Sequence, residues 1–164
     1  MNAVAQASVP PGPEVSAALP GAQRAGASRL TVWGFEVYDA TLWTPPGFTA
    51  AAWAGQPLAL ELRYLRRFDG EDIARRSVDE MRRAGPIAPE QAALWLRTMT
   101  QAFPDVKKGD RLTGIYEPGA GVRFLHNGRT TANVRDPQFA QRFFAIWLGP
   151  HSSEPALREA LLGK

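Results

Sequence analysis

The order of strand-like and helix-like segments is the feature of this sequence that most restricts its fold. Over residues 58–64, apolar side chains recur at every second position, which is the period of a half-buried strand. β-branched and aromatic residues are concentrated between Arg29 and Trp43, where Gly34 indicates a bulge or a tight junction between two strands. Three further strand-like runs, separated by glycine-containing turns, follow at 111–116, 122–126 and 129–134.

Each block of strands is followed by two helix-like segments with apolar stripes at helical spacing. These segments begin near Asp69, Pro89, Asp136-Pro137 and Ser152-Ser153. We expect the side chains of Asp69 and of Ser152-Ser153 to cap the helices that they precede. Because strands and helices are segregated, the sequence predicts an α+β fold in which helices pack on one face of a largely antiparallel sheet.

The first 28 residues differ in composition from the rest of the chain. Only Glu14 and Arg24 are charged in this stretch, which is otherwise rich in alanine, proline and glycine. We therefore expect residues 1–28 to form a flexible arm and residues 29–164 to form a single domain. The segment Ala5-Gln6-Ala7 resembles the end of a secretory signal peptide, which favours a periplasmic protein over a cytoplasmic one.

Composition excludes several classes of function. The absence of cysteine rules out disulfides, thiol catalysis and thiolate metal sites, and the two histidines argue against a multi-histidine metal site. No apolar run reaches 18 residues, so no transmembrane segment is expected. The net charge of +3 is small, and aromatic residues fall on apolar stripes, so nucleic acid is not an expected partner.

No motif of a catalytic or cofactor-binding site is recognisable. Gly119-Ala120-Gly121 lacks the third glycine and the following helix of a dinucleotide loop, and it is better explained as a turn. His126 and His151 each adjoin a turn or helix end, where a histidine is more often inert than catalytic. We therefore expect no catalytic residues, no metal and no cofactor.

The most informative candidate site lies in the first strands. Arg29 could bind a carboxylate and Tyr38 could donate a hydrogen bond to it, while Trp33, Phe35 and Tyr64 line an apolar cavity for the tail of an amphipathic acid. The same residues also fit a simpler interpretation, in which Arg29 lies at a strand edge and the tyrosine is a core residue with a solvated hydroxyl.

Six blocks of the sequence resemble the chalcone isomerase-like family, in particular its bacterial branch. The blocks are 34–43 (GFEVYDATLW), 59–64 (ALELRY), 69–74 (DGEDIA), 109–112 (GDRL), 143–149 (FFAIWLG) and 153–158 (SEPALR), within a region from Gly21 to Gly163. The resemblance implies an open-faced β-sandwich, that is, a large antiparallel sheet with helices packed on one face.

The resemblance also bears on activity. Plant chalcone isomerases use a tyrosine and an asparagine on the helix that begins near Asp69, and Ile73 and Glu80 occupy those positions in this chain. Isoleucine cannot hydrogen-bond a ketone or a water, and a carboxylate would repel a phenolate, so the resemblance implies that the isomerase chemistry is absent. Other members bind fatty acids through an arginine and a tyrosine, for which Arg29, with Arg24 as a competitor, and Tyr38 are the nearest candidates.

Three functional hypotheses follow. The first is a non-enzymatic, periplasmic protein that binds a small amphipathic carboxylic acid such as a fatty acid. The second is an isomerase or intramolecular lyase that acts on an enone, with Arg29 polarising the carbonyl. The third is an interaction module of the cell envelope that has no ligand.

Overall fold

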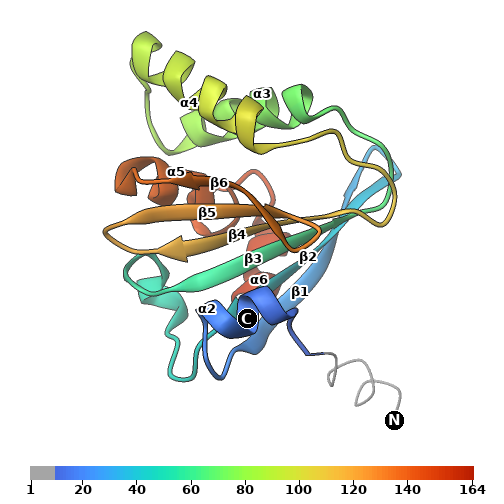
Figure 1. Cartoon of the computed structure of the whole chain (residues 1–164), viewed down its shortest axis with the longest axis vertical. Coiled ribbons are helices and arrows are strands. Elements are labelled where there is room, and N and C mark those ends of the chain that lie inside the picture. The colour runs from blue at the N-terminus through green and yellow to red at the C-terminus, as the bar shows by residue number, and fades with distance from the viewer. Residues whose placement is uncertain (1–9) are drawn as a thin grey trace.

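Six strands form one antiparallel sheet, and their order in space is their order along the chain (Figure 1). The computed structural model describes residues 10–164. The strands are β1 (Gln23–Val32), β2 (Phe35–Thr44), β3 (Leu58–Tyr64), β4 (Arg111–Glu117), β5 (Gly121–His126) and β6 (Arg129–Val134). The predicted α+β fold with an open antiparallel sheet is confirmed.

Two of the hairpins close through two-residue turns. Val32 pairs with Phe35 across Trp33 and Gly34, whose φ angles are 54° and 80°. Asn127 and Gly128 join β5 to β6 in the same way, with φ angles of 50° and 84°. Positive φ at both positions defines the turn type whose twist matches that of the flanking strands. Gly34 therefore marks a tight junction between two strands, one of the two outcomes expected from the sequence.

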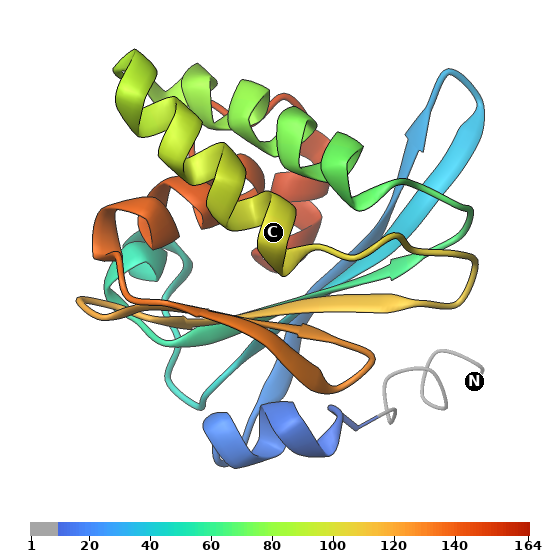
Figure 2. The same ribbon diagram turned by 45° about the horizontal axis from the view of Figure 1, so that its top comes forward.

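The main helices cover one face of the sheet, as Figures 1 and 2 show. They are α3 (Gly70–Met81), α4 (Pro89–Ala102), α5 (Pro137–Leu148) and α6 (Pro155–Leu161), with short 3-10 helices η1 (Ala50–Gly55) and η2 (Arg82–Ala84). In Figure 2, α3 and α4 stand away from the strands and α5 lies between them and the sheet. α3 packs on α4 and α5, and α6 packs on β1.

The predicted helix starts lie within three residues of the observed ones, but neither of the two predicted side-chain caps forms. Asp136 accepts a hydrogen bond from the backbone N–H of Phe139 at 3.0 Å. Asp69 precedes α3 without capping it through its side chain; Asp105 accepts from the backbone N–H of Gly70 at 2.9 Å instead. Ser152 accepts from the backbone N–H of Glu154, the residue just before α6. A carboxylate from a distant loop can thus replace a local cap.

The core lies between the sheet and the helices and is dominated by aromatic side chains. Phe124 on β5 contacts Phe103, Phe139 and Phe143, with ring centroids between 5.0 and 6.3 Å apart. Each buried phenylalanine of this kind contributes about 1.5–3 kcal/mol. These contacts hold α5 against β5 and connect the end of α4 to the sheet.

The N-terminal region is more ordered than the sequence predicts. Residues 13–18 form helix α2 (Pro13–Ala18) on the opposite face of the sheet, and residues 23–28 already belong to β1. Val15 and Leu19 are buried against Trp43, Ile115 and Leu125, which explains the difference. The expected boundary at Arg29 is therefore wrong for residues 13–18 and 23–28, while Ala5-Gln6-Ala7 lies outside the described residues.

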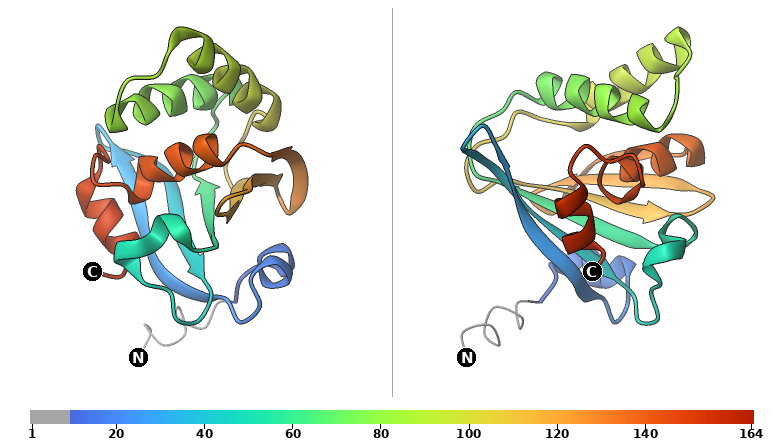
Figure 3. Two further views of the ribbon diagram at one scale, coloured as in Figure 1. Left: turned by 90° about the vertical axis from the view of Figure 1, so that its left-hand side faces the viewer. Right: turned by 180° about the vertical axis from the view of Figure 1, so that it is seen from behind.

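Glycine is required where α6 approaches the sheet. A Cβ atom on Gly26 of β1 would lie 1.9 Å from the carbonyl oxygen of Ala160. Only glycine permits so close a contact between the two backbones. Figure 3 shows α6, in dark red, lying against β1 close to the C-terminus.

Candidate ligand-binding pocket

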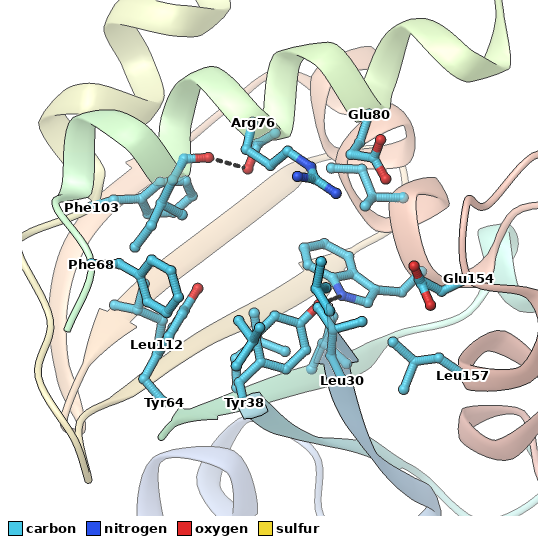
Figure 4. A pocket seen from close by; sticks show the side chains of 18 of the residues that line it. Leu30, Tyr38, Tyr64, Phe68, Arg76, Glu80, Phe103, Leu112, Glu154 and Leu157 are labelled. Atoms are coloured by element: carbon cyan, nitrogen blue, oxygen red, sulfur yellow. Dashed lines mark hydrogen bonds between the residues drawn. The ribbon is translucent and has the colours of Figure 1, made fainter. Parts of the chain in front are cut away.

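A cavity of about 550 Å³ lies between α3, strands β1 to β3 and the segment before α6 (Figure 4). Its size falls in the range of small-molecule sites, roughly 300–1,000 Å³. The wall is mainly apolar and is formed by Leu30, Leu60, Leu62, Leu112, Phe124, Phe143, Ile146, Trp147 and Leu157, among others. The cavity exists because α3 is supported by α4 and α5, which hold it above the sheet.

Arg29 does not face this cavity. Leu30 and Val32 of β1 line the cavity, so the alternation of the strand directs Arg29 to the other face. There it donates hydrogen bonds to Asp39 at 2.7 and 3.0 Å and to Glu36 at 2.6 Å. These bonds, chiefly the pair with Asp39, raise the pKa of the Arg29 guanidinium. Arg29 is therefore not the cation of the pocket, which corrects the expectation from the sequence.

Arg24, the alternative arginine, is an exposed residue of β1 opposite Trp43 and does not line the pocket either. Neither arginine of β1 can therefore bind a ligand in this cavity.

Tyr38 and Tyr64 lie side by side in the floor of the cavity. They are paired across β2 and β3, with ring centroids 5.6 Å apart. The Tyr38 hydroxyl accepts a hydrogen bond from the indole Nε1 of Trp147 at 2.9 Å. Burial raises the pKa of Tyr38 to about 12. Its hydroxyl stays protonated at neutral pH and can donate a hydrogen bond.

The Tyr64 hydroxyl has no hydrogen-bond partner within residues 10–164, although only 4% of the residue is exposed. Burial raises the pKa of Tyr64 well above its usual value, so this group is also a donor. In Figure 4 its oxygen points into the cavity. The oxygen is open to the cavity, so a polar group of a ligand can accept its hydrogen bond in place of water.

Trp33 and Phe35 lie at the outer end of the cavity rather than in its interior. They are 93% and 57% exposed, respectively. The guanidinium of Arg66 lies 4.6 Å from the centre of the Phe35 ring. The structure thus brings together Tyr38, Tyr64, Trp33 and Phe35 of the predicted site and leaves out Arg29.

The sequence analysis missed the contribution of α3. Ile73, Arg76 and Glu80 share one face of this helix and line the cavity, with the Arg76 side chain extending into it (Figure 4). Arg76 forms no salt bridge with any residue that the structure describes, whereas its neighbour Arg75 pairs with Asp72 at 3.0 Å and with Glu71.

Three carboxylates also line the cavity: Asp72, Glu80 and Glu154. Glu80 accepts a hydrogen bond from Ser153, and Glu154 is the residue just before α6 (Figure 4). With Arg76 and, at the outer end, Arg66, the pocket therefore offers two cations, two phenol donors and a long apolar wall.

Other types of site have no counterpart in the described part of the chain. Within residues 10–164, no three histidine or acidic side chains are grouped so that they could hold a metal ion. None of the helices there has the length and apolar character needed to cross a bilayer.

An open antiparallel sheet with helices over one face and an apolar cavity between the two layers defines a class of α+β proteins with a small-molecule pocket. The chain belongs to the chalcone isomerase-like family, whose model matches residues 23–163. The crystal structure of a fatty-acid binding protein from Arabidopsis thaliana has the same fold, with a TM-score of 0.66, 10% identity and 88% coverage of each chain. No curated protein sequence matches the chain significantly.

Proposed function

We propose that this protein binds a small amphipathic carboxylic acid, such as a fatty acid, without converting it. The observation that carries the proposal is the Tyr64 hydroxyl, which forms no hydrogen bond within residues 10–164 and points into an apolar cavity that also contains the Arg76 side chain. The fold shared with a fatty-acid binding protein of Arabidopsis thaliana supports the same class of ligand.

In this arrangement Arg76 pairs with the carboxylate and Tyr64 donates a hydrogen bond to it. The apolar walls, including Leu62, Phe124 and Trp147, contact the hydrocarbon chain. Glu80 and Glu154 face the same cavity, so a second carboxylate on the ligand would be repelled. The site therefore favours monocarboxylic acids with a long apolar part.

Native mass spectrometry of the gently purified protein, beside a denatured control, tests the proposal directly. A bound species of fatty-acid mass that is lost on denaturation is the expected result. A protein that carries no such species and takes up no added fatty acid would contradict the proposal and favour a ligand-free interaction module.

Two neighbouring arginines provide a matched pair of variants for a titration with a fluorescent fatty acid. Arg76→Gln should weaken binding by about 1.5–3 kcal/mol, or roughly tenfold or more, because a charge-assisted hydrogen bond is lost. Arg75→Gln should leave the affinity unchanged, because Arg75 does not line the pocket and pairs with Glu71 and Asp72. Equal affinities of the two variants would exclude Arg76 as the anchor.

The non-enzymatic part of the proposal is supported by Ile73 and Glu80, which line the cavity at the positions matched to the tyrosine and the asparagine of plant chalcone isomerases. The absorbance of an added chalcone should stay constant in the presence of the protein. Catalysed loss of that absorbance would favour the alternative, an isomerase or intramolecular lyase acting on an enone.

We also propose that the protein works in the periplasm. The support is Ala5-Gln6-Ala7 in the sequence, and fractionation of cells that express the natural gene tests it. Recovery with the cytoplasmic proteins would contradict this location.

A further inference from the structure

The tip of the β1–β2 hairpin combines two features that are unfavourable for an isolated folded protein. Trp33 is 93% exposed, and its φ of 54° lies in the left-handed region, where asparagine or glycine is preferred. Phe35, next but one in sequence, is 57% exposed. The other four tryptophans are buried, so the exposure of Trp33 is specific to this position. Strain and exposure of this kind concentrate at functional sites.

Basic residues adjoin this tip. The loop after β3 runs beside the start of β2, where Leu65 donates a backbone hydrogen bond to Val37 at 2.9 Å. This loop carries Arg66 and Arg67, and both side chains are exposed. Neither forms a salt bridge within residues 10–164, and Arg66 lies over the Phe35 ring.

A second loop reaches the same end of the sheet. Phe68 and Val106 exchange backbone hydrogen bonds of 2.9 and 3.1 Å, which join the loop before β4 to the loop after β3. The second loop contributes the exposed Lys108. In Figure 2, both loops converge below the hairpin tip on the right-hand side.

Most carboxylates at this end of the sheet are already engaged. Asp105 accepts a hydrogen bond from the backbone N–H of Gly70, Lys107 pairs with Asp110 at 3.7 Å, and Arg29 pairs with Glu36 and Asp39. Arg66, Arg67 and Lys108 form no salt bridge within residues 10–164, which leaves these exposed cations available to an anionic surface.

We propose that this tip surface, formed by Trp33, Phe35, Arg66, Arg67 and Lys108, docks the protein on a lipid bilayer that contains anionic headgroups. Tryptophan is favoured at the level of the headgroups, and arginine can extend to the phosphates while its aliphatic stem contacts apolar surface. Trp33, Phe35 and Arg66 also line the outer end of the pocket, so docking brings the cavity to the membrane. Docking itself requires no bound ligand.

Sedimentation with vesicles made from phosphatidylcholine and phosphatidylserine, free of fatty acid, tests the docking. Wild-type protein should bind these vesicles, and its tryptophan emission should shift to shorter wavelength because Trp33 is its one exposed indole. Binding to phosphatidylcholine alone should be weaker, since the cations then have no counter-charge. Wild-type protein that does not sediment with the mixed vesicles would overturn the proposal and point to a protein partner at the tip.

Trp33→Asn is the informative variant, because Asn-Gly suits this turn and the fold should be retained. It should bind the mixed vesicles roughly tenfold more weakly. Leu94→Gln is the matched control, since Leu94 is another large exposed apolar residue, 47% exposed, on α4. Circular dichroism verifies that both variants are folded. Equal vesicle binding by Trp33→Asn and wild type, or an equal loss in Leu94→Gln, would overturn the docking surface. Neither outcome bears on fatty-acid uptake, which is measured without vesicles.

Discussion

At the scale of single residues, the Tyr64 hydroxyl is available to a ligand. It lies in the cavity wall, is open to the cavity and forms no hydrogen bond within residues 10–164. The adjacent Tyr38 hydroxyl differs, because Trp147 already donates a hydrogen bond to it. Of these two paired tyrosines, Tyr38 is thus hydrogen-bonded within the protein, and Tyr64 has no partner within residues 10–164.

Replacing Tyr64 with phenylalanine should therefore weaken binding and leave stability almost unchanged. The free energy of unfolding in urea should change by less than about 0.5 kcal/mol, because the hydroxyl forms no hydrogen bond within residues 10–164 and is open to the cavity. Fatty-acid affinity should fall by about 1 kcal/mol, or roughly fivefold, because one donor is lost. A variant with lower stability and unchanged affinity would show that the hydroxyl has a structural role and does not contact the ligand.

Single residues also show why only part of the site could be predicted from the sequence. The apolar phase of β1, with Leu30 and Val32 on one face, is visible in the sequence and places Arg29 on the other face. Arg29 was predicted to bind the ligand because an arginine suits a carboxylate, although the alternation of β1 places it on the opposite face. Arg75 and Arg76, in contrast, both have acidic neighbours at helical spacing, and only the packing of α3 decides which of the two faces the cavity.

At the scale of elements, Trp33 lowers the stability of the β1–β2 hairpin. Its turn requires positive φ at both positions, and Trp33 is strained there. Trp33→Asn should raise the free energy of unfolding by about 1 kcal/mol. This gain corresponds to a rise in Tm of roughly 2–4 °C for a domain of this size. A lower Tm would mean that the Trp33 ring stabilises the hairpin through contacts at the pocket rim.

The elements themselves were predictable because their signals are local. Alternation defines β3, Asn127-Gly128 defines the last hairpin, and Pro89 and Pro137 begin helices at the expected positions. The capping of α3 by Asp105 was not predictable, since it joins residues 35 positions apart. Helix α2 was missed for the same reason, because its two buried apolar residues require a sheet face that is formed by distant strands.

At the scale of the whole molecule, the two faces of the sheet have separate roles. The pocket and the larger helices occupy one face, and α2 covers part of the other through Val15 and Leu19.

Deleting residues 1–21 should destabilise the protein by about 3 kcal/mol or more, since two fully buried aliphatic side chains are removed. Fatty-acid uptake by the remaining folded protein should be unchanged. Thermal unfolding checks the first expectation and native mass spectrometry the second, and loss of uptake at a temperature where the variant is folded would contradict the separation of roles.

The contact between α6 and β1 brings together the last and the first elements of the matched domain. α6 and the segment before it supply Glu154 and Leu157 to the pocket, so the cavity has no complete wall until α6 has left the ribosome. The six strands, by contrast, pair in chain order and can assemble as synthesis proceeds. The nascent chain therefore acquires its sheet first and its capacity to retain a ligand only after α6 has been made.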